Sequence, residues 1–134
     1  MPGSQSISKP QTFNFDLADP SLTGFASNVT GATWTLTATN SGDGLAHQVS
    51  LRNDSANSKA AINVTFVGTD PDGNALSETI AGPAGNATVE TAGYFRTLTS
   101  VTPASTWGAD TGDIGYVDEI ASGIIPLNHL AEDI

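Results

Sequence analysis

The segment from Ile62 to Pro103 constrains the fold most strongly, because it combines short alternating runs with closely spaced turn signals. Residues 70–74 (DPDGN) are typical of a tight turn, since proline favours a φ of about −65° and glycine accepts a positive φ. Leu76, Glu78 and Ile80 then alternate along the returning strand. This pattern predicts a β-hairpin, followed by further short strands.

The same rhythm extends through the middle of the chain, where turn signals recur about every 8–12 residues and apolar residues never keep helical spacing for three turns. We expect strands at residues 32–39, 47–52, 62–66 and 76–80, around Val89, and at 94–101 and 114–117. In the first of them Trp34, Leu36 and Ala38 alternate with threonines, as in a half-buried antiparallel strand. The sequence therefore predicts an all-β fold: a small antiparallel β-sandwich or barrel, Ig-like or jelly-roll-like, spanning residues 31–117.

The two ends of the chain differ from this middle. Residues 1–30 contain three prolines and thinly spaced apolar residues, so we expect an extended N-terminal arm with one short strand around Phe13, Phe15 and Leu17. The arm has two possible destinations, its own domain or a neighbouring molecule. Residues 118–134 form an apolar, proline-broken C-terminal tail that either closes the core or is buried against another subunit. Its apolar residues are Ile124, Ile125, Leu127 and Leu130.

Charge and composition exclude several classes of function. The net charge is −10, with 14 acidic and only 4 scattered basic residues among 134, so direct binding to nucleic acid or to an anionic membrane is not expected. This charge either serves solubility or steers the protein onto a basic partner. The chain has no cysteine, which excludes disulfides and thiolate chemistry and favours a reducing cytoplasm. We expect neither a signal peptide nor a membrane span, because no segment approaches about 20 consecutive apolar residues.

The sequence offers no catalytic or cofactor-binding residue that we can assign. His47 and His129 each lack a second ligand at metal-binding spacing, and no nucleophile elbow, phosphate loop or dinucleotide fingerprint occurs. The carboxylates that might pair as in a glycosidase are Glu78, Glu90, Asp110, Asp113, Asp118 and Glu119. Nothing in their spacing selects two of them, so we expect a non-enzymatic protein.

One feature resembles the beginning of a calcium loop. Asp70, Asp72 and Asn74 surround Gly73 in a pattern that supplies oxygen ligands on a bent chain. The twelfth position of an EF-hand loop would require a glutamate, and that position is Ala81. We therefore expect a hairpin turn, with an incidental weak calcium site as the alternative.

An ordered set of short motifs runs from Ile62 to Val117 and covers about two-fifths of the chain. In order, the motifs are Ile62-Asn63-Val64, Gly68-Thr69-Asp70-Pro71-Asp72-Gly73-Asn74, Ser77-Glu78-Thr79-Ile80, Gly82-Pro83 and Tyr94–Val101. This set resembles a family of structural proteins of tailed-bacteriophage particles. The resemblance implies a virion component without catalytic residues, most directly a capsid decoration (cement) protein that stabilises the assembled shell.

The resemblance also implies partners and a location. It implies binding to the major capsid protein or to other virion proteins, with assembly in the cytoplasm of a host bacterium. Decoration proteins often form trimers at capsid three-fold sites, so we expect a homo-oligomer, with a trimer favoured. A head-neck or tail accessory protein is the alternative, because both termini lie outside the matched region. Deletion of residues 1–30 is then expected to leave the domain folded but to weaken attachment.

Two further classes of function stay open. An Ig-like adhesion module would bind sugar through exposed aromatic side chains, for which Trp34, Tyr94, Trp107 and Tyr116 are the candidates. Trp107 lies in an expected loop and is the best of them, although we favour the reading in which this tryptophan fills the core. A small carbohydrate-active enzyme would need two converging carboxylates, and no motif predicts such a pair.

Overall fold

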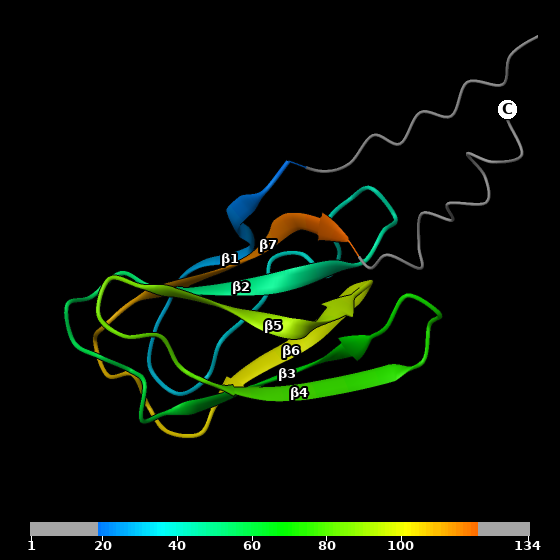
Figure 1. Ribbon diagram of the computed structural model, residues 1–134. Helices are drawn as coiled ribbons and strands as arrows, with labels where there is room; N and C mark the ends of the chain where they lie inside the picture. The colour runs from blue at the N-terminus through cyan, green and yellow to red at the C-terminus, as the bar shows by residue number, and fades with distance from the viewer. Residues whose placement is uncertain (1–18, 121–134) are drawn as a thin grey trace, which may run out of the picture.

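The computed structural model describes residues 19–120, which form two packed antiparallel β-sheets (Figure 1). All regular elements within these residues are strands: β1 (Ser21–Val29), β2 (His47–Asn53), β3 (Asn63–Thr69), β4 (Ala75–Ala81), β5 (Thr88–Phe95), β6 (Thr97–Pro103) and β7 (Gly112–Ile120). One sheet has four strands in the order β1-β7-β2-β5, and the other has three in the order β4-β3-β6. The predicted all-β sandwich is confirmed.

The β3–β4 hairpin forms where the turn signal predicts it. The two strands pair in continuous register from Asn63 opposite Ala81 to Thr69 opposite Ala75. Asp70 donates its backbone N–H to the Asn74 carbonyl at 2.8 Å, and Gly73 takes a φ of 87°, which glycine adopts without steric cost.

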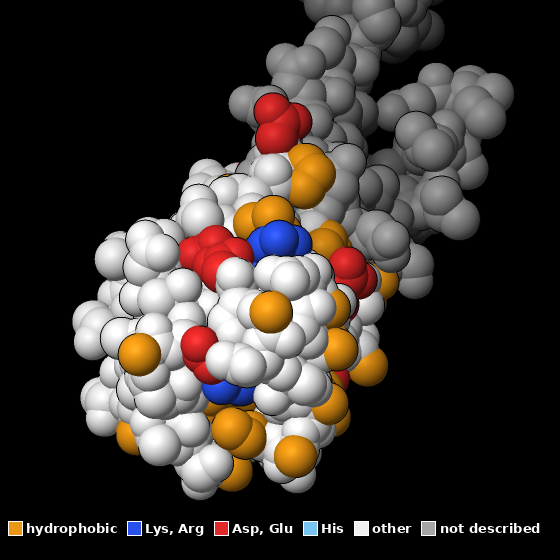
Figure 2. Space-filling view, turned by 90° about the vertical axis from the view of Figure 1, so that its left-hand side faces the viewer, with side chains coloured by type: hydrophobic (Ala, Val, Ile, Leu, Met, Phe, Trp, Pro, Cys, Tyr) orange, Lys and Arg blue, Asp and Glu red, His pale blue; other side chains and the backbone are white. Residues whose placement is uncertain are grey.

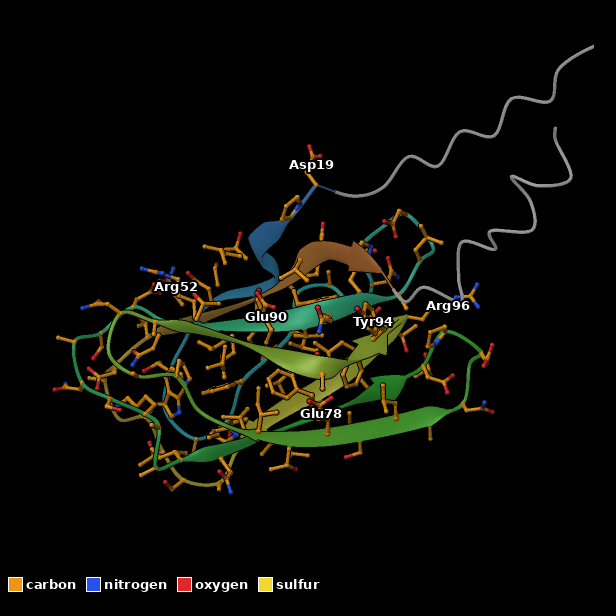
Figure 3. All side chains as sticks on the ribbon, in the orientation of Figure 1. Asp19, Arg52, Glu78, Glu90, Tyr94 and Arg96 are labelled. Carbon is orange, nitrogen blue, oxygen red and sulfur yellow. The ribbon has the colours of Figure 1, made fainter. Side chains whose placement is uncertain are left out.

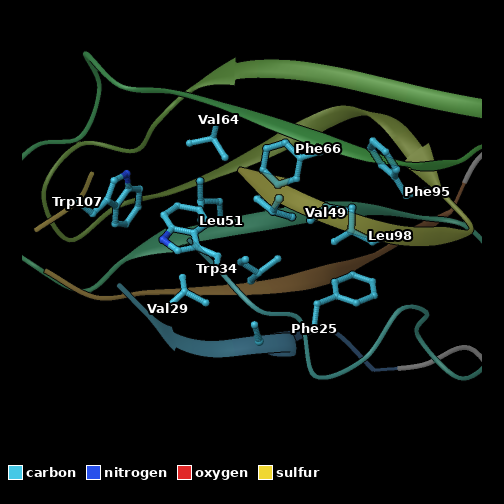
Figure 4. Packing of buried hydrophobic residues seen from close by; sticks show 13 residues of the cluster. Phe25, Val29, Trp34, Val49, Leu51, Val64, Phe66, Phe95, Leu98 and Trp107 are labelled. Carbon is cyan, nitrogen blue, oxygen red and sulfur yellow. The ribbon is translucent and has the colours of Figure 1, made fainter. Parts of the chain in front are cut away.

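The core lies between the two sheets and is filled from alternate positions of the strands (Figure 4). Its largest buried hydrophobic side chains include Phe25, Val49, Leu51, Val64, Phe66, Phe95, Leu98, Val101, Trp107 and Ile114. Trp34 packs edge-to-face against Trp107, with ring centroids 4.9 Å apart. Of the two readings open for Trp107, the core position is therefore the correct one.

The prediction of a strand at residues 32–39 is wrong in its backbone pairing but right in its burial. Trp34 is buried, Leu36 and Ala38 are half-buried, and the threonines between them are exposed. The segment is thus extended and buried on one face only, yet none of its residues belongs to a paired β-strand. Alternating burial requires only that one face of the segment is covered. A β-strand also requires a neighbouring strand in register, and the alternation in the sequence indicates only the covered face.

Residues 31–40, which we call the bridging segment, make their backbone hydrogen bonds to both sheets. Thr37 donates its N–H to the carbonyl of Phe25 in β1 at 2.7 Å. At the other end of the segment, the carbonyl of Thr39 accepts from the N–H of Leu98 in β6 at 2.7 Å. Since β1 and β6 are edge strands of different sheets, the segment joins the two layers along one side of the sandwich.

The predicted single strand at residues 94–101 is divided in the structure. Phe95 ends β5 in the four-stranded sheet, and Thr97 begins β6 in the three-stranded sheet. Both Phe95 and Leu98 are buried, a spacing of three that a continuous strand with period two cannot direct to one face. Arg96 is the crossing point, and its N–H bonds the carbonyl of Thr69 at 2.8 Å.

The predicted boundaries of the sandwich at residues 31 and 117 are also wrong. Ser21–Val29 form β1, a strand of the four-stranded sheet, although the sequence assigned them to the arm. The last strand, β7, continues to Ile120. Residues 1–18 of the predicted arm and 121–134 of the predicted tail lie outside the described residues, among them Phe13, Phe15, Leu17, Ile124, Ile125, Leu127, Leu130 and His129.

β-Bulges explain why the sequence pattern did not predict β1. The stretch from Ser21 to Ala26 lies opposite only residues 114–116 of β7, so several residues of β1 have no direct partner. Gly24 sits against the ring of Tyr116, where a β-carbon would collide with it. The buried residues of β1 consequently do not alternate, and a search for period two misses them.

We predict that deletion of residues 1–30 unfolds the domain rather than leaving it intact. The deletion removes Phe25, Ala26 and Val29 from the core and uncovers the edge of β7. Loss of one buried phenylalanine alone costs about 3–5 kcal/mol. Urea unfolding of the full chain and the deleted chain measures the difference, and an unchanged free energy of unfolding would contradict the placement of β1.

Candidate interaction surface

Glu78 links the two sheets on the side of the sandwich opposite the bridging segment. From β4 its two carboxylate oxygens accept hydrogen bonds from the N–H groups of Ala92 at 2.6 Å and Gly93 at 2.7 Å, both in β5 (Figure 3). Since β4 and β5 are edge strands of different sheets, this carboxylate joins the layers opposite the bridging segment. It also occupies two N–H groups at a sheet edge, where another chain would otherwise add a strand.

Lys59 and Asp110 form the most buried ion pair with a lysine or arginine in residues 19–120. The Lys59 ammonium is 2.6 Å from Asp110 Oδ2 and 3.4 Å from the carbonyl of Trp107, and Lys59 is only 8% exposed. Asn57 donates its side-chain amide to the same carboxylate. The hydrogen bond from Lys59, with that from Asn57, lowers the pKa of Asp110 below its ordinary 3.8. This cluster ties the loop before β3 to the loop before β7.

His47 and Asp43 form a second buried pair, and its geometry is structural. The ring nitrogens of His47 lie 2.8 Å from Asp43 Oδ2 and 2.8 Å from the carbonyl of Val117. The other oxygen of Asp43 accepts from Ser41 Oγ and from the N–H of Leu45. In a nucleophilic triad the serine bonds the histidine, whereas here it bonds the carboxylate. The pair therefore anchors the loop before β2 against β7.

One carboxylate oxygen of Asp70 accepts hydrogen bonds within its own turn. Asp70 Oδ1 accepts from the N–H groups of Asp72 and Asn74, both at 2.9 Å, which is an ordinary Asx turn. Within residues 19–120 there is no group of three or more histidine, cysteine or acidic residues that could hold a metal ion.

The candidate carboxylates have separate positions. Glu78 and Asp110 hold the contacts described above, Asp113 accepts from the N–H of Asn28 at 2.9 Å, and Glu90 is exposed on β5 (Figure 3). The side chains of Asp118 and Glu119 lie outside the described residues. These four described carboxylates thus lie in different parts of the fold, on β4, on β5, on β7 and in the loop before β7.

The aromatic residues proposed for sugar binding are mostly enclosed. Trp34 is 8% exposed and Trp107 is 2% exposed, so neither offers a ring to a ligand. Tyr116 is half-buried between Phe25 and His47, with ring centroids 5.4 and 5.3 Å away. Tyr94, on β5, is half-buried as well (Figure 3).

The outer face of the three-stranded sheet carries no charged side chain. We call it the hydroxyl face, and its outward residues are Asn63, Thr65, Val67 and Thr69 of β3, Ala75, Ser77, Thr79 and Ala81 of β4, and Thr97, Thr99, Ser100 and Thr102 of β6. Val67, near its centre, pairs with Ser77 on one side and Ser100 on the other, and it is 38% exposed. Small side chains cover this side of β4 in Figure 3.

The threonines of this face are held by hydrogen bonds between neighbouring strands. Thr65 and Thr79 are joined at 2.8 Å between their hydroxyl oxygens, and Thr69 and Thr97 at 2.7 Å. The hydroxyls are therefore fixed in position before any partner arrives. Sequence reasoning missed this face, although uncharged residues at every second position of 63–69 and 75–81 were a signal for it.

The four-stranded sheet presents a different outer face. Arg52 of β2, Glu90 of β5 and Asp113 of β7 point outward from it, and Arg52 pairs with Asp54 at 3.0 Å. The end of the sandwich in Figure 2 is mostly white, with few red and blue side chains. The outer face of the four-stranded sheet thus carries charged side chains, whereas the hydroxyl face carries none.

We predict that Glu78→Ala destabilises the fold through the loss of its link to β5. Two hydrogen bonds to an ionised carboxylate disappear, for which a loss of about 1–3 kcal/mol is expected. Glu90→Ala is the matched control, since Glu90 is an exposed glutamate of the neighbouring strand β5 whose side chain makes no hydrogen bond to the described residues, and it should change stability by less than about 0.5 kcal/mol. Equal effects of the two substitutions in urea unfolding would contradict the role of Glu78.

We predict an acid-dependent contribution from Asp110. Because its folded pKa is lowered below the ordinary 3.8, the charged carboxylate stabilises the fold fully above the unfolded pKa, and this contribution is lost as the pH falls through the folded pKa. Asp110→Asn should therefore lower the melting temperature by a constant amount at neutral pH, and the difference from wild type should shrink below about pH 4. A difference that stayed constant down to about pH 2 would contradict this assignment.

Comparison with known proteins identifies no family for this chain. No family model, curated protein or solved structure matches it. Among residues 19–120 there is also no helix long and apolar enough to cross a membrane. Function must therefore be argued from the surfaces described above and from the sequence motifs.

Proposed function

We propose that this protein is a non-enzymatic structural protein of a phage virion, most directly a decoration protein that binds the assembled capsid and stabilises it. The observation that carries the proposal is the ordered set of motifs between Ile62 and Val117, which resembles structural proteins of tailed-phage particles. In this chain the named motifs lie on the strands and the hairpin turn of the three-stranded sheet, in the turn after β4 and at the end of β5. The motifs thus belong to one connected part of the fold.

The individual motifs coincide with positions that the fold needs. The turn at residues 70–74 closes the hairpin, and Glu78 joins the two sheets. Gly82 packs directly against the carbonyls of Lys59 and Ile62, where a β-carbon would collide. These motif residues are therefore structural in this chain.

The described surface favours binding over chemistry. The buried histidine and the carboxylates of Glu78, Asp70 and Asp110 all hold loops or strands together. Both sides of the sandwich are bridged, which leaves a rigid body whose binding has to occur through faces, loops or termini. A rigid body loses little conformational entropy on docking, and a protein that binds only the assembled shell stabilises it by mass action.

The partner in this proposal is the major capsid protein, or another virion protein at the same surface. A net charge of −10 keeps free copies soluble before assembly. A homotrimer at a capsid three-fold site is the arrangement that the resemblance favours, with assembly in the host cytoplasm and the virion as the final location.

We predict that shells lacking this chain gain thermal stability when it is added back. The experiment uses particles from phage in which the encoding gene is deleted, mixed with the purified full chain, and measures the temperature at which the shells open. At a free concentration about 100 times the dissociation constant, each occupied site contributes about 2.7 kcal/mol to the shell. A saturable number of copies per shell and a raised opening temperature are the expected results.

The same particles distinguish the alternatives. Wild-type virions are separated into heads and tails, and the chain is located by mass spectrometry. Its presence only in the neck or tail fraction would replace decoration with an accessory role. Its absence from purified virions would overturn the proposal altogether.

A further inference from the structure

The imidazole ring of His47 has a hydrogen-bond acceptor at each of its two nitrogens. The residue is 1% exposed, its Nδ1 lies 2.8 Å from the carbonyl oxygen of Val117, and its Nε2 lies 2.8 Å from Oδ2 of Asp43. A carbonyl and a carboxylate only accept, so each ring nitrogen must carry a hydrogen if both bonds are to form. A neutral imidazole has a single N–H, and the geometry therefore fits an imidazolium.

The carboxylate of Asp43 is arranged to keep this extra proton on the ring. Its other oxygen, Oδ1, accepts from Ser41 Oγ and from the N–H of Leu45. Imidazole is a stronger base than a carboxylate, so the hydrogen between Nε2 and Oδ2 belongs to the ring. If that proton left, two acceptors would face one another at 2.8 Å inside the protein, an arrangement that burial makes costly.

The other described elements around the ring add no competing charge. From β7, Tyr116 places its ring centroid 5.3 Å from that of His47, and its hydroxyl donates to the carbonyl of Ser41 at 3.4 Å. From β5, the residue opposite His47 is Phe95, which does not titrate. Arg96 follows Phe95 but donates to the carbonyl of Pro71, in the β3–β4 turn.

We propose that Asp43, His47 and the carbonyl of Val117 form a pH-sensitive latch, which fastens the loop before β2 to the end of β7 while the ring is protonated. The loop side is organised by Asp43, which binds within residues 41–45. The strand side lies near the end of β7, where Ile120 is opposite His47. Residues 121–134 continue from this strand end, so the latch acts at the base of the tail. The inference does not rest on the proposed virion function.

The direction of the pH dependence follows from which state holds the proton. A histidine in the unfolded chain loses its extra proton around pH 6.5. Above that pH the folded chain binds more protons than the unfolded chain, so the free energy of unfolding falls as the pH rises. The fall ends once the latch itself has released the proton. Acid therefore closes the latch, and alkali opens it.

Nitrogen-15 NMR of the full chain tests the state of the ring. At about pH 7.5 only about one in ten histidines of an unfolded chain carries the extra proton. In the folded chain we expect both nitrogens of His47 to give the similar resonances of an imidazolium. His129→Gln removes the signals of the chain's other histidine and so assigns them. Two widely separated resonances, as in a neutral ring, would overturn the proposal.

Amide hydrogen exchange tests whether the loop follows the ring. The N–H of Leu45 is bonded to Asp43 at the latch, whereas the N–H of Gly73 is bonded to the carbonyl of Asp70 in the β3–β4 turn. After correction for intrinsic rates, the protection of Leu45 should fall at least about tenfold as the ring deprotonates, and that of Gly73 should not change. An equal change in both amides, or none in Leu45, would contradict a latch.

Asp43→Asn should reverse the sign of the pH dependence. The new side-chain amide can donate to Nε2 of a neutral ring, and its oxygen can still accept from Leu45, so the closed latch no longer needs the extra proton. Between about pH 5.5 and about pH 9, the melting temperature should fall with rising pH in the wild type and rise in this variant.

Asp54→Asn is the matched control for this reversal. It makes the same chemical change in an exposed carboxylate that pairs with Arg52, away from the histidine. Its melting temperature should depend on pH as that of the wild type does. A wild-type slope in Asp43→Asn would overturn the proposal. If Asp43→Asn does not fold, the ring resonances and the Leu45 amide of the wild-type chain decide.

Discussion

The contact between Trp34 and Trp107 is the interaction on which the rest of this sandwich depends. The chain has no disulfide, so packing and hydrogen bonds alone hold its two sheets together. The two indole rings meet edge-to-face at 4.9 Å, and Gly31 exchanges backbone hydrogen bonds with Trp107 and Gly108 beside them. This contact holds the bridging segment in place, and the segment in turn spans from β1 to β6.

Closure of both sides determines which surfaces are left for recognition. The bridging segment covers one side, and the carboxylate of Glu78 covers the other. These contacts occupy part of the strand edges, and the outer faces of the two sheets remain as contact surfaces. One face is charged and the other is lined by hydroxyls. This asymmetry allows an acidic protein to remain soluble while one of its surfaces can contact a partner with little charge repulsion.

The local elements of the fold could be predicted wherever the signal was local. The β3–β4 hairpin followed from its turn residues, because Pro71 fixes its own φ and Gly73 accepts a positive φ before any tertiary contact forms. The burial of Trp34 followed from alternation. By contrast, the division between β5 and β6 at Arg96 and the bulged strand β1 were not predicted, since both depend on which sheet the chain joins. The hydroxyl face was not predicted either, because its twelve residues come together only after three strands have paired.

The sequence by itself determined the fold class, the main hairpin, the excess of acid and the lack of cysteine, because composition, turn residues and period-two alternation act through the chain alone. Tertiary structure decided which extended segments became paired strands, which carboxylates hold the sheets together and which face is free of charge. The physical reason is that hydrogen-bond partners such as Glu78 with Ala92 and Gly93, or Lys59 with Asp110, are distant in sequence. Their pairing is specified only when the two layers pack.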